Sequence, residues 1–149
     1  MFEGIPILTI ITFLPLLAAG FLTLMSKLSR ADGKGQIETN APRVALVTTL
    51  AVFGLSLLLL VDFHAADAAY QFTENRDWLG GGIKYRMGLD GISILFVVLT
   101  TFLTPLCIIA SAKSIKTRML EYMVAFLILE TLMIGVFCAQ DMVLFYFFF

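Results

Sequence analysis

The stretch LILETLMIGVFCAQDMVLFYFFF, from Leu127 to Phe149, places one carboxylate inside a long apolar run and a second one at a polar break. Glu130 lies within the run, and Asp141 precedes a further run rich in aromatic residues. An ionisable residue at the centre of a membrane helix costs about 2.5–3.5 kcal/mol on insertion scales, so by default it indicates transport chemistry. The stretch therefore predicts a membrane helix that carries a functional carboxylate.

The composition of the whole chain agrees with this prediction. Of 149 residues, 60% are hydrophobic and 14% are charged, and the mean hydropathy is +0.96, whereas a soluble domain has about 25% charged residues. Runs long enough to span a membrane, about 20 apolar residues each, occur four times. They lie at about 5–25, 42–61, 89–112 and 119–140, and a fifth begins at Met142. We expect an all-α, polytopic membrane protein, and the net charge of −1 offers no basic field for nucleic acid.

The connections between these runs differ in character. The first, 26–40, contains Asp32-Gly33-Lys34-Gly35 and is predicted to be a loop with a flexible turn. The second, 62–88, is the longest, and its triple glycine at 80–82 lies between FTENRDWL and IKYRMGL. This arrangement is compatible with a small hairpin at the membrane surface. Asp90, at the start of the third run, fits a carboxylate that faces the positive end of a helix dipole.

Lysine and arginine are concentrated in alternate connections. The first connection holds Lys27, Arg30 and Lys34, and the six residues 113–118 hold three more basic residues, whereas the N-terminus holds none. The positive-inside rule places these two basic connections in the cytoplasm. It follows that the N-terminus and the connection 62–88 are expected on the outer side.

The carboxylates can be placed relative to one another by helix geometry. If one helix extends that far, Asp141 lies ~16 Å from Glu130 on nearly the same face. Both are candidates for proton translocation, because a carboxyl group that changes between its charged and neutral forms can carry a proton. Two alternatives stay open: Glu130 as a buried acid hydrogen-bonded to a neighbouring helix, and Asp141 as the cap of the next helix. Glu121 is explained by a surface ion pair with the adjacent basic residues.

Two longer segments resemble a known family. They read DGISILFVVLTTFLTPLCIIAS at 90–111 and KSIKTRMLEYMVAFLILETLMIGVFCAQDMVLFYFFF at 113–149. Both are similar to subunit M of proton-pumping NADH:quinone oxidoreductase, respiratory complex I. The resemblance implies an antiporter-like fold of about fourteen helices built on inverted repeats, in which midplane charges carry the ion path. This chain would then supply the N-terminal part of that fold.

The resemblance also implies partners, cofactors and missing residues. The expected partners are the lipid bilayer and the other membrane subunits of complex I, including antiporter-like sister subunits. Quinone, FMN and iron–sulfur clusters would be bound elsewhere in the complex, with no cofactor in this chain. The family's functional glutamate would follow directly after Phe149, and its intramembrane lysines lie on later helices. We therefore expect that this chain alone does not pump protons.

Function is accordingly predicted as proton translocation within an enzyme complex, driven by quinone reduction on other subunits. The expected location is the bacterial inner membrane, in preference to the mitochondrial inner membrane. Two alternatives remain: a subunit of a multisubunit cation/proton antiporter or membrane hydrogenase, and a structural or assembly protein of the membrane. In the second alternative, Glu130 only holds helices together.

Overall fold

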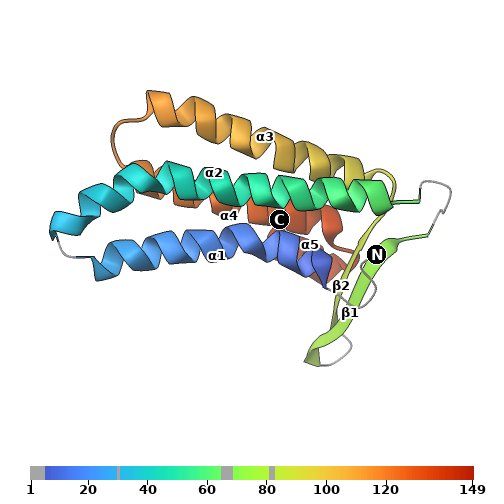
Figure 1. Cartoon of the computed structure of the whole chain (residues 1–149). Coiled ribbons are helices and arrows are strands. Elements are labelled where there is room, and N and C mark those ends of the chain that lie inside the picture. Colours follow the sequence, from blue (N-terminus) through green and yellow to red (C-terminus); the bar gives the residue numbers. More distant parts are fainter. Residues whose placement is uncertain (1–5, 30, 65–68, 81–82) are drawn as a thin grey trace.

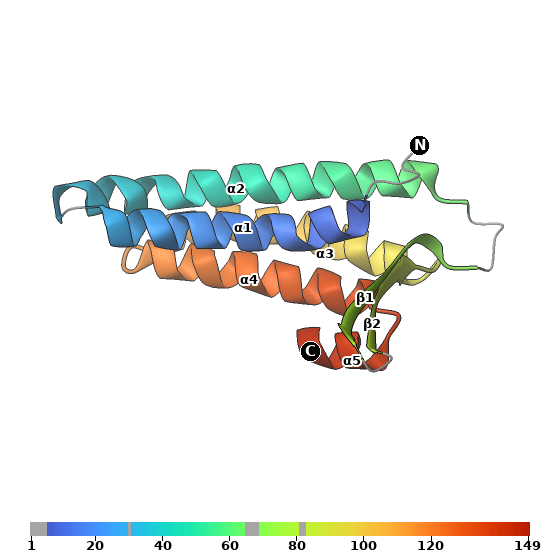
Figure 2. The same cartoon turned by 90° about the horizontal axis from the view of Figure 1, so that it is seen from below.

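The computed structural model describes residues 6–29, 31–64, 69–80 and 83–149. Four long helices lie side by side as a bundle, and a two-stranded hairpin lies across one end of it (Figures 1 and 2). The elements in chain order are α1 (Ile7–Leu28), α2 (Ala31–Asp62), β1 (Gln71–Gly80), β2 (Ile83–Leu89), α3 (Ser93–Ser114), α4 (Met119–Cys138) and α5 (Met142–Phe148).

The four long helices have the length and composition of membrane spans. The apolar segments are 22, 28, 22 and 20 residues long, and at ~1.5 Å per residue each can cross a hydrocarbon core of about 30 Å. Large apolar side chains are exposed along all four helices, which suits contact with lipid or with other membrane helices. The predicted polytopic helical membrane protein is confirmed, and the short helix α5 begins at Met142 as expected.

The predicted loop at 26–40 is wrong for most of its length. Helix α2 begins at Ala31, so Asp32-Gly33-Lys34-Gly35 is helical and Pro42 lies inside the helix. The polar composition of this segment indicates where the chain leaves the membrane, but a helix can continue into water past that point. At 32 residues, α2 is about 48 Å long by the helix rise, well beyond the thickness of the hydrocarbon core.

The hairpin has an antiparallel register with a bulge near its beginning. Gln71 pairs with Leu89 and Glu74 pairs with Met87, so three steps along β1 match two steps along β2. Phe72 has a φ of 54°, a left-handed conformation that is uncommon for a bulky residue. A bulge of this kind can redirect the side chains that follow it. Here it places Glu74 on the same face as the buried Met87, toward the bundle.

Helix α4 ends two residues earlier than predicted, because the chain joins the hairpin there. Ala139 forms a bridge with Met87, and the Gln140 N–H donates to the carbonyl oxygen of Arg86 at 3.0 Å. The chain then turns into α5, which packs back on α4. The ring of Phe148 lies so close to Gly135 that a Cβ at that position would come within 2.4 Å of it.

Two separate apolar clusters form the core of the bundle. The hairpin-end cluster contains buried residues from every helix and from β2, among them Ile11, Val52, Val97 and Ile134. The far-end cluster lies toward the connections 29–31 and 115–118 and consists of Ala19, Leu22, Ala41, Ala45, Ile108, Met123 and Leu127. The level between these clusters contains the candidate site.

Candidate functional site: a buried carboxyl between two apolar clusters

Glu130 is located on the buried face of α4, one turn from Leu127 of the far-end cluster and one turn from Ile134 of the hairpin-end cluster. Only 1% of its surface is exposed. Among the residues that the structure describes, neither Oε1 nor Oε2 has a hydrogen-bond partner. Burying a polar group without a partner is unfavourable, and buried polar groups in proteins are usually paired. The arrangement therefore calls for a functional explanation.

All four long helices contribute buried polar side chains to the part of the bundle between the hairpin-end cluster and the far-end cluster. Along each helix they fall between the residues of the hairpin-end cluster and those of the far-end cluster. We call this set the polar layer, and it consists of Thr12, Thr49, Thr100, Thr101, Thr104, Glu130 and Thr131, all buried. Since every helix contributes to it, the layer divides the apolar interior into two parts.

Most hydroxyl groups of the polar layer are satisfied locally. Thr49, Thr104 and Thr131 each donate to a backbone carbonyl of their own helix, at 2.9–3.2 Å. Thr101 also pairs with Ser56 of α2, with 2.8 Å between the two oxygens. The Oγ1 atom of Thr12 is the exception, because it is buried and has no partner within the described chain.

Within the described parts of the chain, the buried polar and charged residues comprise hydroxyl side chains and Glu130, with no lysine, arginine or histidine among them. Glu130 thus has no cationic partner there. The alternative that its carboxyl forms a hydrogen bond to a neighbouring helix also finds no support among these residues. A carboxyl in this setting can take up or release a proton without first breaking an ion pair.

Asp141, the second predicted candidate, does not lie on α4. That helix ends at Cys138, so the condition under which Asp141 would share a face with Glu130 is not met. Asp141 is the N-cap of α5, where its Oδ1 accepts a hydrogen bond from the Val143 N–H at 2.8 Å. The alternative of a helix cap is therefore what the geometry shows, and the side chain is partly exposed.

Two other titratable residues behave as surface groups. Glu121 forms an ion pair with Arg118 at 2.5 Å, with both side chains largely exposed, as expected from the sequence. His64 is exposed, and its backbone exchanges two hydrogen bonds with the side-chain amide of Gln71. Both residues are exposed, unlike the buried residues of the polar layer, and neither suggests a proton path of its own.

A third carboxylate, Glu74, was not anticipated as a site. From the hairpin, it accepts hydrogen bonds from the Leu8 N–H at 2.7 Å and the Thr9 N–H at 3.3 Å, and from the Thr9 hydroxyl. It thereby satisfies free N–H groups in the first turn of α1, where Pro6 supplies no side-chain cap. A cap supplied from 66 residues away leaves no local signal in the sequence.

Tyr85 completes this contact between the hairpin and α1. Its hydroxyl lies 2.9 Å from the Thr9 hydroxyl. Burial at this contact, opposed by the hydrogen bond to Thr9 and reinforced by the nearby Glu74 charge, raises the pKa of Tyr85 above its usual value. The contact fixes one end of α1 against the hairpin.

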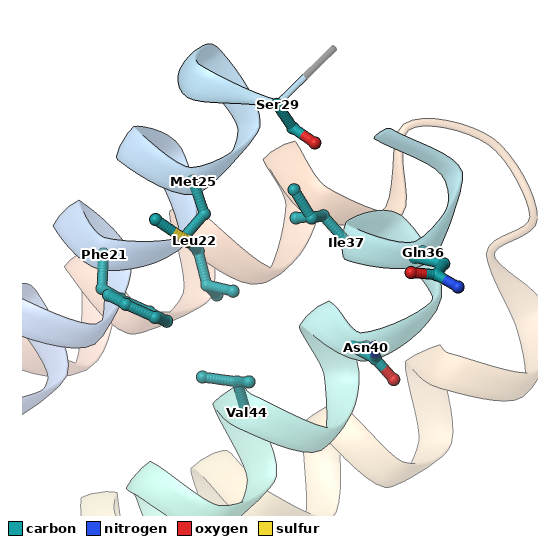
Figure 3. Close-up of a pocket in the computed structure, with 8 residues that line it drawn as sticks. All are labelled: Phe21, Leu22, Met25, Ser29, Gln36, Ile37, Asn40 and Val44. Carbon is teal, nitrogen blue, oxygen red and sulfur yellow. The ribbon is translucent and has the colours of Figure 1, made fainter. Parts of the chain in front are cut away.

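A groove at the far end of the bundle lies between the end of α1 and the beginning of α2 (Figure 3). Its volume is about 280 Å³, and its lining is apolar except for Ser29, Gln36 and Asn40. It contains neither Glu130 nor Asp141. No group of three or more potential metal ligands occurs in the described part of the chain.

The fold and the site together define a class: a polytopic membrane protein whose helical bundle buries a carboxyl that has no hydrogen-bond partner among the described residues. Residues 41–139 match the family described as NADH-ubiquinone oxidoreductase chain 4, amino terminus. The chain belongs to this family.

Curated relatives support the assignment over almost the whole chain. The chain is 55% identical over 143 residues to an NADH-quinone oxidoreductase subunit M of Rhodobacter capsulatus, covering 96% of this chain and 27% of the relative. It is 40% identical to subunit M of Rickettsia typhi, over 97% of this chain and 29% of the relative. It is 39% identical to the NADH-ubiquinone oxidoreductase chain 4 of Mycosarcoma maydis, over 95% and 28%. The chain thus spans less than a third of the length of these relatives.

Proposed function

We propose that this chain forms part of a proton-translocating membrane subunit of NADH:quinone oxidoreductase and that Glu130 exchanges protons during the cycle. The observation that carries the proposal is the buried Glu130 carboxyl, which has no hydrogen-bond partner within the described chain. An intramembrane ionisable residue is a functional site by default. Membership in a family whose relatives are named as subunits of this enzyme supplies the reaction.

Redox chemistry is assigned to other subunits in this proposal. Quinone, FMN and the iron–sulfur clusters are bound elsewhere in the complex, and this chain carries no cofactor. Its partners are the lipid bilayer and neighbouring membrane subunits, including antiporter-like sister subunits. Quinone reduction at a distance would change the protonation of buried groups such as Glu130 through this chain of contacts.

The proposed location is the bacterial inner membrane with the N-terminus outside. The hairpin, the start of α1 and the end of α4 lie at the same end of the bundle, as their hydrogen bonds show. The basic connection at 113–118 lies at the opposite end (Figure 1). The positive-inside rule then places the connections 29–31 and 115–118 in the cytoplasm.

The test is Glu130→Gln in the full-length subunit, assembled in the whole complex. Glutamine keeps the size of the side chain but cannot exchange a proton, so NADH-driven proton pumping in membrane vesicles should fall while complex assembly is retained. Glu121→Gln is the matched control, because Glu121 is on the same helix but is exposed and paired with Arg118. The control should pump normally.

Normal pumping by Glu130→Gln would remove Glu130 from the proton path and favour the alternative that this region is a structural scaffold. Loss of assembly in Glu130→Gln alone would point to the same scaffold role. Asp141 is tested in the same assay, because it is the second candidate proton carrier in the proposal. Asp141→Asn keeps the helix cap, because asparagine caps about as well as aspartate, so reduced pumping by this variant would indicate a role for the carboxylate beyond capping.

A further inference from the structure

We infer that the groove between the end of α1 and the beginning of α2 binds one anionic phospholipid. An acyl chain would occupy the apolar part of the groove, and the phosphate group would lie at its polar end, beside Arg43. This lipid site is independent of the proposed function, because the groove contains neither Glu130 nor Asp141.

The lining of the groove changes from apolar to polar in one direction. The apolar part, farther from the connection 29–31, consists of Phe21, Leu22, Met25 and Val44. The part nearer that connection consists of three polar residues and one apolar residue, namely Ser29, Gln36, Asn40 and Ile37 (Figure 3). A phospholipid changes in the same order, from its acyl chain to its headgroup, so the two halves of the groove suit the two halves of the lipid.

The groove also lies at the depth in the membrane that a lipid of one leaflet occupies. Helix α1 ends at Leu28, so the polar end of the groove coincides with the end of this membrane span. From Phe21 to Ser29 the lining extends about 12 Å along α1, close to the ~15 Å that one leaflet contributes to a hydrocarbon core of about 30 Å. A bound acyl chain would therefore lie alongside the chains of the bilayer, with its headgroup at the usual depth.

Arg43 supplies the charge that favours an anionic headgroup. Its side chain is exposed, and its Nη1 donates a hydrogen bond at 3.4 Å to the Oδ1 of Asn40, which lines the groove. Side chains on a helix lean toward the helix N-terminus, which for Arg43 is toward the polar end of the groove. A guanidinium group is well suited to bind a phosphate group.

The acid of α2 closest in sequence does not oppose this charge at the groove. Glu38 is exposed, and at ~100° per residue it lies on the opposite side of α2 from Asn40. Basic residues near a membrane surface attract anionic lipids, and each contributes about 1 kcal/mol. The charge at the mouth of the groove thus favours an anionic lipid over a neutral one.

A membrane helix is a poorer occupant of this groove than an acyl chain. The groove has a volume of about 280 Å³, whereas a helix with its side chains is about 10–12 Å wide. A helix would cover the groove and leave a void beneath it, which packed protein interiors avoid. The last helix also lies elsewhere, because α5 packs on α4, on the opposite side of the bundle from α2 (Figure 2).

Brominated lipids test this site in a cryo-electron microscopy map of the complete complex in lipid nanodiscs. One preparation contains brominated phosphatidylglycerol in an excess of phosphatidylcholine, and the other contains brominated phosphatidylcholine in the same proportion. We expect bromine density in the groove with phosphatidylglycerol and about fivefold less with phosphatidylcholine, the effect of one basic residue on an anionic headgroup. Polypeptide in the groove, equal density from both lipids, or no lipid density would overturn the inference.

Arg43→Gln tests the role of the charge in the same preparations. Glutamine keeps a long polar side chain, so the density from labelled phosphatidylglycerol should fall to that from phosphatidylcholine. Lys27→Gln is the matched control, because Lys27 is exposed at the same end of the bundle but does not line this groove. The control should retain the full density, and equal density in the two variants would contradict selection of the headgroup by Arg43.

Val44→Phe tests the position of the acyl chain. The larger side chain fills the apolar part of the groove, so bromine density there should be lost while the complex still assembles. Full density in Val44→Phe would show that the chain lies elsewhere. None of these outcomes bears on Glu130→Gln, so the lipid site and the proposed function can fail separately.

Discussion

The carboxylates at the hairpin end of the bundle differ from the one in its middle in the number of hydrogen-bond donors they meet. Glu74 accepts from three donors on α1, Asp90 from two backbone N–H groups, and Asp141 from one. Glu130 accepts from none among the described residues. Each of the three carboxylates at the hairpin end thus has at least one donor, whereas the carboxyl in the polar layer has none in the described chain.

This difference separates two uses of the same chemical group. A carboxylate held by backbone N–H groups at a helix start stabilises the charged form and the local fold together. A buried carboxyl without donors contributes little to stability and keeps its freedom to exchange a proton. The hairpin end therefore holds carboxylates that anchor helix starts, whereas the proposed proton-exchange group, Glu130, lies in the middle of α4. Removing a carboxylate should lower stability at the hairpin end and should not lower it at Glu130.

The largest expected effect is the loss of the Glu74 anchor. Glu74→Ala should lower the free energy of unfolding by about 2 kcal/mol, because bonds from the N–H groups of Leu8 and Thr9 to a charged acceptor are lost together. Chemical denaturation of the purified chain in detergent, followed by circular dichroism, measures this change. Asp77→Ala is the control on the same strand, since Asp77 is exposed and should change stability by less than about 0.5 kcal/mol.

Glu74→Gln tests whether charge or shape is responsible. The amide oxygen still accepts hydrogen bonds but carries no charge, so its stability should lie between those of the wild type and Glu74→Ala. If Glu74→Ala proved as stable as Asp77→Ala, the hairpin would not anchor α1. The view that carboxylates at the hairpin end stabilise the fold would then be contradicted.

The next effect has the opposite sign. Glu130→Leu should raise the free energy of unfolding by about 1 kcal/mol, because an apolar side chain of similar size removes a buried, unpaired polar group. The same variant should lose NADH-driven proton pumping in the full-length subunit. Glu121→Leu is the control on α4, where only an exposed ion pair worth about 0–1 kcal/mol is lost. A marked loss of stability in Glu130→Leu would show that Glu130 has a structural partner after all.

The sequence predicts some of these features better than others. Hydropathy located four membrane spans, because a run of about 20 apolar residues is a local property with a direct physical meaning. A single acid in such a run is also conspicuous, and the structure buries the Glu130 side chain; its role in proton transfer stays a prediction. The helical segment 31–40 at the beginning of α2 was missed because its polar composition resembles that of a loop, and a helix outside the membrane is not required to be apolar.

Features that depend on packing could not be read from one stretch of sequence. Glu74 caps α1 from 66 residues away, and its direction depends on the bulge at Phe72. The polar layer consists of threonines that are unremarkable along each helix and become a set only when the helices align. Thr12 was accordingly not anticipated as a buried hydroxyl.

The smallest effect concerns Asp90, the intermediate case in the comparison. The Ser93 N–H donates to its Oδ1 at 2.6 Å, and this bond, helped by the Ser93 hydroxyl and then by the Ile92 N–H, holds the pKa of Asp90 below its usual value. Because the folded-state pKa is lowered, the stabilisation is fully present above the unfolded-state value of about 3.9 and is lost as pH falls through the lower folded-state pKa.

Asp90→Ala should therefore lower the free energy of unfolding by about 0.5–1 kcal/mol at neutral pH. The difference from the wild type should shrink when unfolding is repeated below pH ~4, where Asp90 is protonated in the unfolded state. Asp90→Asn keeps an uncharged cap, so its own contribution should not vary over this range. A pH-independent difference between the wild type and Asp90→Ala would mean that the charge of Asp90 is not what stabilises the start of α3, and the ranking of carboxylates by donor number would then lack its middle member.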